Sequence, residues 1–108
     1  FTAGVLSAKS KEQIKTDLST VWLSDDSLIK QIANRQGQDF DFDDYARLPE
    51  VLYHPDKIEQ DGKNTFRFYK EVDSRKLVAV IKVLNESKEI YLTSQHLASE
   101  RQWRKAFR

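Results

Sequence analysis

Three strand-like runs in the last third of the chain carry the residues best suited to chemistry. They cover residues 65–70, 76–84 and 88–95. Because successive side chains of a strand point to opposite faces, each run divides into two sets of residues. One set is apolar and belongs to a core: Phe66, Phe68, Ile90 and Leu92. The other set offers the cations, phenols and hydroxyls that bind a phosphate: Arg67, Tyr69, Tyr91 and Thr93.

Lys82 is a charged residue inside a run that is otherwise apolar from residue 77 to residue 84. If the odd-numbered residues of that run face the core, Lys82 and Val80 face the other way. The strand register then decides whether Lys82 meets Arg67, whose planar fork of donors suits phosphate oxygens. An ordinary solvated sheet face has the same composition, so this pattern alone leaves both interpretations open.

The two histidines are candidate proton carriers. His54 lies between Tyr53 and Pro55, and His96 follows the last strand-like run. Either side chain can titrate near neutral pH and move a proton, although a loop histidine is more often a surface residue. No metal-ligand spacing surrounds them, and the chain has no cysteine and no glycine-rich phosphate loop. We therefore expect neither a metal nor another cofactor.

Basic and aromatic residues alternate in the C-terminal segment, residues 101–108. Arg101 and Arg104 flank Trp103, and Phe107 follows Trp103 at a spacing of four, as on one face of a helix. Such residues can stack on RNA bases and pair with phosphates, which makes Arg101 and Arg104 candidate substrate-binding residues. Alternatively, the segment is a capping helix with its aromatic side chains in the core and its charges in solvent.

The composition is that of one globular domain. The chain has 108 residues, of which 39% are apolar and 32% charged, and no run approaches the length of a membrane span. The net charge is only +1, so a nucleic-acid partner has to be argued from the local distribution of charge. The absence of methionine indicates a piece of a longer polypeptide, with a processed terminus as the alternative.

The first half of the chain predicts helices. Residues 7–18 fit a weak helix capped by Ser10, or a linker, and residues 20–23 fit a small edge strand. A helix should follow the capping cluster at 24–27 and stop at Gly37. Asp41 can cap a second helix, and Pro49 either breaks that helix or starts another turn.

A weak strand at 57–60 and the hairpin signal Asp61-Gly62 lead into the three runs. The order predicts an α+β fold in which N-terminal helices pack on a four-stranded antiparallel meander. We expect residues 1–19 to be a lead-in helix or linker and residues 20–108 to form the functional domain.

Several short blocks together resemble a known family. They are residues 21–30, a helix from Asp41 to Leu48 followed by 49–52, then His54-Pro55-Asp56, and a strand that ends in 91–94. This order is similar to that of phage-borne Barnase–EndoU–colicin–RelE-like nucleases, which occur in Mu F-like head-morphogenesis proteins and polymorphic toxins. The resemblance covers about residues 21–96.

The resemblance implies metal-independent cleavage of RNA, in which the ribose 2′-hydroxyl attacks the neighbouring phosphate. By position, it implies that Lys30, Arg67 and Lys82 are the site's cations, and that Thr93 and Ser94 are its hydroxyl pair beside Tyr91. It leaves the acid and base open. His54 or His96 can serve, or else Tyr69 or Tyr91 acting with a lysine.

The resemblance also implies partners and a setting for the domain. RNA, with tRNA as one candidate class, is the expected substrate, and a cognate immunity or antitoxin protein is the expected partner. The domain is expected to be monomeric and without membrane contact. It would act in the cytoplasm of a target or host cell, or as part of a phage-associated or secreted protein. Two alternatives are a non-catalytic module of a head-morphogenesis protein that binds nucleic acid or protein, and an immunity or adaptor protein whose acidic segment, residues 39–50, mimics nucleic acid.

Overall fold

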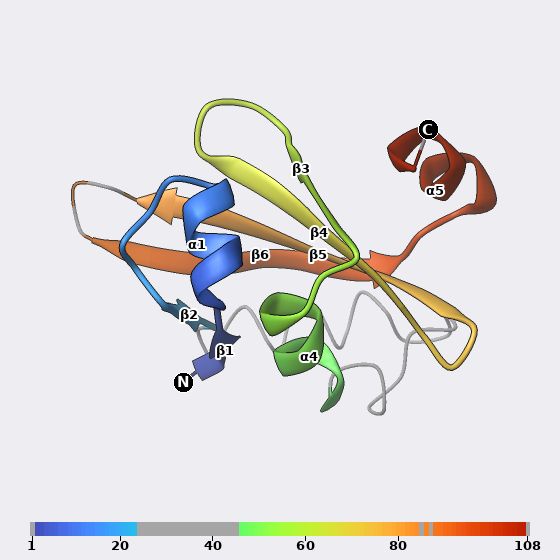
Figure 1. The fold of residues 1–108 in the computed structure, drawn as a ribbon, viewed down its shortest axis with the longest axis horizontal. Helices are drawn as coiled ribbons and strands as arrows, with labels where there is room; N and C mark the ends of the chain where they lie inside the picture. Colours follow the sequence, from blue (N-terminus) through green and yellow to red (C-terminus); the bar gives the residue numbers. More distant parts are fainter. Residues whose placement is uncertain (1, 24–45, 85, 87, 108) are drawn as a thin grey trace.

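The computed structural model describes residues 2–23, 46–84, 86 and 88–107. In Figure 1 the first helices lie on the near side of the sheet, and the C-terminal helix lies beyond one end of it. None of the helices in these residues is long and apolar enough to cross a membrane. The strands are β1 (Thr2–Val5), β2 (Thr20–Trp22), β3 (Lys57–Gln60), β4 (Thr65–Val72), β5 (Arg75–Leu84) and β6 (Glu89–Leu97), and the helices are α1 (Ala8–Gln13), α4 (Leu48–Tyr53) and α5 (Glu100–Ala106).

The sheet has six strands in the order β1-β2-β6-β5-β4-β3. All neighbours are antiparallel except β2 and β6, which are parallel. The α+β class is therefore confirmed, and β3 to β6 pair as an antiparallel meander, but the predicted four-stranded antiparallel sheet is wrong, because β1 and β2 extend it to a mixed sheet of six strands. The expected edge strand at 20–23 lies inside the sheet, because β1 covers its outer side. β1 is only four residues long and was not recognisable beside the polar segment that follows it.

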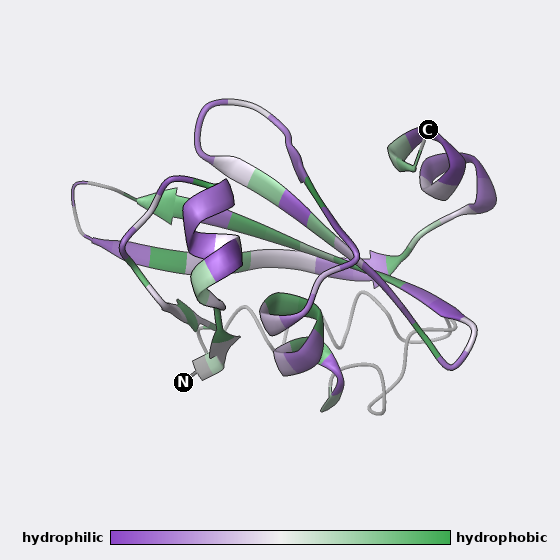
Figure 2. Ribbon diagram, in the orientation of Figure 1, coloured by the Kyte–Doolittle hydropathy of each residue, from purple (hydrophilic) through white to green (hydrophobic). Residues whose placement is uncertain are grey.

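The strand alternation predicted for the core is confirmed. Phe66, Phe68, Ile90 and Leu92 are all buried, as are the odd-numbered residues of β5 from Leu77 to Val83. Figure 2 shows the resulting alternation of hydrophobic and hydrophilic residues along the strands. This core face is covered by α1 and α4. Ile14, which caps the C-terminal end of α1, and Val51 and Leu52 of α4 belong to the same cluster.

Gly4 of β1 lets α4 approach the sheet closely. A Cβ atom at Gly4 would lie 3.0 Å from Leu52 Cδ1 and 3.1 Å from Pro49 Cα. Since the second contact is to backbone, a side chain there would push α4 away. Residues before position 20 therefore belong to the packed structure, as the burial of Ala3 and Leu6 also indicates.

The helix ends follow capping rules, with one correction. Ser7, not Ser10, caps α1, because the Ser7 side chain accepts a hydrogen bond from the Ser10 backbone while Ser10 itself is buried. α1 is also shorter than expected. Pro49 lies in the first turn of α4, so it starts a helical turn, as one of the two readings predicted. The helices predicted after residue 24 and from Asp41 lie outside the described residues.

The third helix, α5, packs on the opposite face of the sheet. Its Trp103 and Phe107 rings stack at 4.2 Å, and each meets the Tyr69 ring edge-on at about 6 Å. Ala106 joins Tyr69 and Val78 in a second, smaller core. This packing supports the capping-helix interpretation of the C-terminal segment. It also means that the helices do not all lie on the apolar face.

Candidate nuclease site on the polar sheet face

The sheet face opposite α1 and α4 brings most of the predicted site residues together. In the register, Val80 of β5 lies opposite Arg67 of β4 on one side and Ser94 of β6 on the other. Two residues further along β5, Lys82 lies opposite Tyr91. Paired residues share a face, so these side chains surround Val80. We call this side of the sheet the polar face; its central residues are Arg67, Val80, Lys82, Tyr91, Thr93 and Ser94.

A β-bulge in β6 places two consecutive hydroxyls on the polar face. Val80 pairs with Ser94, but the next residue, Ile81, pairs with Leu92, so Thr93 is an extra residue. Strand alternation from Leu92 and the pairing of Ser94 put both hydroxyl side chains on the same side. Thr93 Oγ1 donates to the Val80 carbonyl at 3.2 Å. Bulges are common beside active sites, where they redirect side chains.

The bulge also changes the orientation of the residues that follow it. Gln95 pairs with Ala79 on the core face and is fully buried, whereas His96 pairs with Val78 on the polar face. Without the extra residue, the alternation that buries Leu92 would have turned His96 toward the core. The bulge therefore places His96 on the same side as Ser94, two residues away along the strand, at roughly 7 Å between Cα atoms.

Arg67 is held by two carboxylates. Its guanidinium donates a hydrogen bond to Glu59 and lies 3.6 Å from an Asp61 carboxylate oxygen. Burial acts to lower the pKa of Arg67, but Tyr69, Glu59 and Asp61 together raise it above its ordinary value. Arg67 is thus a permanent cation whose charge is partly neutralised when no ligand is bound.

Tyr69 lies beneath α5 and is only 1% exposed. Its hydroxyl donates to the Glu59 carboxylate at 3.2 Å. Burial raises the pKa of the phenol above its ordinary value of 10.0; the positive charge of Arg67 opposes this shift, and Glu59 adds to it. Tyr69 is therefore placed to support the Glu59–Arg67 pair, and its part in binding substrate or moving a proton stays a prediction.

Lys82 and Tyr91 lie at the solvent-exposed end of the polar face, away from α5. The Lys82 side chain is exposed, and Thr65 lies opposite it on β4. Tyr91 donates its hydroxyl to Glu89 at 2.9 Å, and that hydrogen bond raises the pKa of the phenol. Tyr91 therefore remains protonated at neutral pH, as a hydrogen-bond donor or acid requires. Trp22 of β2 extends this row, and 40% of its surface is exposed.

The other predicted site residues divide into three groups. Arg101 and Arg104 are exposed on α5, and Arg104 pairs with Glu100 at 3.6 Å. His54 ends α4 on the helix side of the sheet, so it does not join the polar face. There it lines a cavity of about 770 Å³ together with Tyr53 and Lys70. Lys30 lies outside the described residues.

The acidic neighbours of Arg67 and the β6 bulge were not among the sequence-based expectations. Glu59 lies three residues before Gly62 and Asp61 directly before it, and strand pairing sets Glu59 opposite Arg67. A charge-complementary pair across a hairpin was therefore recognisable once β3 was assigned. The bulge had a weaker signal, the change in polarity after Leu92. Within the described part of the chain, no three His, Asp or Glu side chains gather as a metal site would require.

Comparison with known protein families identifies the group to which this arrangement belongs. A family model described as phage-Barnase-EndoU-ColicinE5/D-RelE like nuclease 3 matches residues 1–105 of the 108-residue chain. The chain belongs to this nuclease family. The match begins at the first residue, so it includes β1 and α1 as well as the blocks that suggested the resemblance. No solved structure matches the chain. Family membership makes a nucleic acid the expected substrate of the domain.

Proposed function

We infer that this domain is a metal-independent endoribonuclease whose active site is the polar face. The observation that carries the inference is the β6 bulge, which sets Thr93 and Ser94 side by side across Val80 from Arg67. Hydroxyls on one side of a small apolar floor and a guanidinium on the other can hold the oxygens of one phosphate. Lys82 lies diagonal to Arg67 on β4 and to Ser94 on β6, at roughly 7–8 Å from each, and supplies a second cation.

The proposed reaction is an internal transesterification. The ribose 2′-hydroxyl gives its proton to a base and attacks phosphorus, the bond from phosphorus to the 5′-oxygen breaks, and that oxygen takes a proton from an acid. The products are a 2′,3′-cyclic phosphate and a 5′-hydroxyl end. DNA lacks the attacking hydroxyl, so the mechanism is specific to RNA.

Each residue of the polar face has a proposed part in this chemistry. Arg67 and Lys82 stabilise the charge that develops on the phosphorane oxygens, and Thr93 and Ser94 position the phosphate. His96 is preferred over His54 as a proton carrier because it lies on the polar face. Tyr91, which stays protonated, can donate to the leaving oxygen. Lys30 remains a predicted phosphate-binding residue of the same site, and Arg101 and Arg104 remain predicted substrate-binding residues.

The test is cleavage of tRNA and a defined oligoribonucleotide in the presence of EDTA. We expect a cyclic phosphate product, a loss of about 100-fold in kcat/KM for Lys82→Ala and roughly tenfold for Thr93→Val. Lys9→Ala is the matched control, because Lys9 is exposed on α1 at the other face. Intact RNA at high enzyme concentration, or equal losses in the control, would contradict the proposal.

A pH profile tests the proton carrier separately. If His96 moves a proton, kcat/KM should change between about pH 5 and 8, and His96→Gln should remove that dependence while His54→Gln keeps it. The reverse result would transfer the role to His54 and place the chemistry on the helix side.

A non-catalytic binding module is the second candidate function. It is favoured by the neutralisation of Arg67 by Glu59 and Asp61, and by the burial of Tyr69 under α5. In that case the same face would bind nucleic acid or protein within a head-morphogenesis protein. Salt-dependent RNA binding without any product would select it. Origin in a phage or toxin polypeptide and an immunity partner remain expectations of either function.

A further inference from the structure

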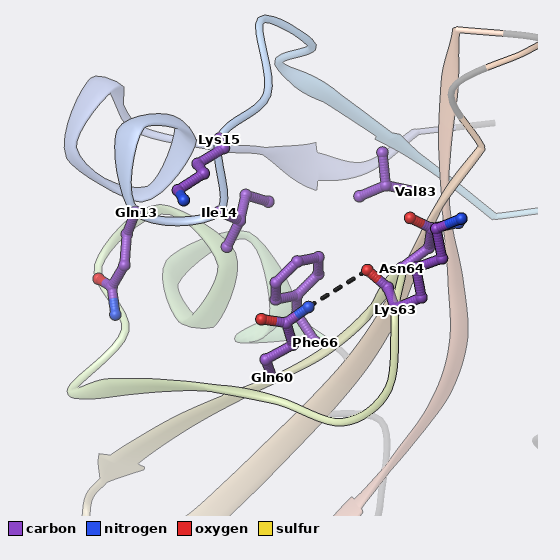
Figure 3. Close-up of a pocket in the computed structure, with 8 residues that line it drawn as sticks. All are labelled: Gln13, Ile14, Lys15, Gln60, Lys63, Asn64, Phe66 and Val83. Carbon is purple, nitrogen blue, oxygen red and sulfur yellow. Dashed lines mark hydrogen bonds between the residues drawn. The ribbon is translucent and has the colours of Figure 1, made fainter.

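A second cavity, besides the one that His54 lines, lies on the helix side of the sheet between the end of α1 and the β3–β4 hairpin. Figure 3 shows the residues that line this cavity, whose volume is about 280 Å³. Its floor is apolar and consists of Ile14, Phe66 and Val83. Its rim is polar and consists of Gln13, Lys15, Gln60, Lys63 and Asn64. We call it the hairpin pocket.

The floor and rim of the hairpin pocket suit a nucleobase. Phe66 belongs to the core and is only 8% exposed, so it gives a base an aromatic contact at the floor beside Ile14 and Val83 rather than a full stacking surface. Amide side chains both donate and accept hydrogen bonds, which is what the edge of a base requires. Three amides surround this floor, and one of them is oriented by a hydrogen bond from Gln60 Nε2 to the Lys63 carbonyl at 3.2 Å.

The charge of the hairpin pocket favours an anion. Two lysines contribute to the rim, and none of the described residues that line it is acidic. Lys15 adopts a left-handed backbone conformation with φ 59°, at the position where helices usually end in glycine. A base and a neighbouring phosphate are the parts of one nucleotide.

The hairpin pocket and the polar face lie on opposite sides of the same end of β4. Phe66 points into the pocket, whereas the adjacent residues Thr65 and Arg67 point to the polar face. Lys82 lies opposite Thr65, at the same end of the sheet. A single strand of RNA that passes round the tip of the β3–β4 hairpin can therefore contact both surfaces.

We propose that the hairpin pocket binds one nucleotide of the RNA substrate, outside the bond that is cleaved. This assignment of the occupant to the substrate rests on the proposed ribonuclease function. The pocket itself is argued from its own residues: an aromatic floor, an amide rim and two cations. It sets affinity and base preference rather than the rate of the chemical step.

Nucleotide binding followed by NMR tests the proposal with adenosine 5′-monophosphate as the probe. We expect saturable shifts of the Gln60 and Asn64 side-chain amides and of the Val83 methyls, with weaker effects from adenosine or inorganic phosphate alone. The variant Lys15→Gly/Lys63→Gln should weaken binding by roughly tenfold. Glycine suits φ 59°, so this change does not threaten the fold. Lys105→Gln, an exposed change on α5, should leave binding unchanged.

The outcomes separate this proposal from the ribonuclease proposal. Shifts confined to residues of β6, no saturable shift, or equal binding of phosphate and the nucleotide would overturn the hairpin pocket as a nucleotide site. If the nucleotide binds there but RNA is never cleaved, the pocket stands and the catalytic proposal fails. If the double variant cleaves a long oligoribonucleotide with unchanged KM, cleavage stands and the pocket is not a substrate site.

Discussion

At the scale of single residues, the site is defined by how its charges are paired. Arg67, the residue best suited to grip a phosphate, already contacts Glu59 and Asp61, whereas Lys82 is exposed. A phosphate that binds Arg67 must compete with the carboxylates for the same donors. The free protein therefore holds Arg67 in position, at a cost in affinity for the ligand.

Glu59→Gln should raise the affinity for RNA several-fold, because the competing negative charge is removed while the side-chain shape is kept. The same change should lower the free energy of unfolding by about 1–2 kcal/mol, since a charge-assisted hydrogen bond to Arg67 is weakened. Fluorescence anisotropy and chemical denaturation measure the two effects. Glu50→Gln, an exposed change on α4 at the other face of the sheet, removes the same charge and is the control. Weaker RNA binding in Glu59→Gln would argue for a direct role of Glu59 at the substrate.

The Tyr69 phenol predicts a loss of stability at high pH. Its pKa is raised in the folded protein, so the folded state binds the proton more tightly than the unfolded state does. The resulting stability is fully present below about pH 10 and is lost as the pH rises through the folded pKa. Thermal unfolding from pH 8 to 11 should show a steeper decline for the native protein than for Tyr69→Phe. Parallel declines would mean that other groups dominate.

At the scale of elements, the regular parts of the fold were predictable and the irregular parts were not. β3 to β6 and α5 follow from alternation, the Asp61-Gly62 signal and aromatic spacing, because these patterns act locally. The parallel pairing of β2 with β6 joins segments far apart in the chain, and no local pattern encodes it. The bulge at Thr93 likewise depends on the partner strand, so the sequence predicted the hydroxyl pair only by resemblance.

The β4–β5 hairpin offers a test of turn chemistry. Asp73 and Ser74 both have positive φ, 50° and 68°, as a two-residue type I′ turn requires. Ser74→Gly should therefore raise the free energy of unfolding by about 0.5–1 kcal/mol, because glycine adopts this conformation without strain. Asp73 is kept, since it pairs with Arg47 at 2.7 Å. Thermal melting measures this gain. In the same assay Ser99→Ala, which removes the N-cap of α5, should lower the free energy of unfolding by about 1 kcal/mol. A lower melting temperature for Ser74→Gly would contradict the turn assignment.

At the scale of the whole molecule, the two faces of the sheet are used differently. α1 and α4 cover the apolar face and complete the main core, whereas α5 covers only the part of the opposite face around Tyr69 and Val78. The rest of that face carries Arg67, Lys82 and the hydroxyls. With a net charge of +1, the protein as a whole does not attract RNA strongly. The proposed RNA binding must therefore depend on local cations beside the polar face.

The salt dependence of RNA binding measures how many of those cations contact phosphate. Each neutralised phosphate of a single strand contributes about −0.7 to the slope of log K against log salt concentration. If Arg101 and Arg104 extend the polar face along α5, the double change to Gln should reduce the magnitude of the slope by about 1.4 while leaving the cleavage rate at saturating RNA nearly unchanged. Lys9→Gln/Lys11→Gln, on α1 at the other face, removes the same charge and is the control. An equal slope for the α5 variant and the native protein would mean that RNA passes over the sheet without reaching α5.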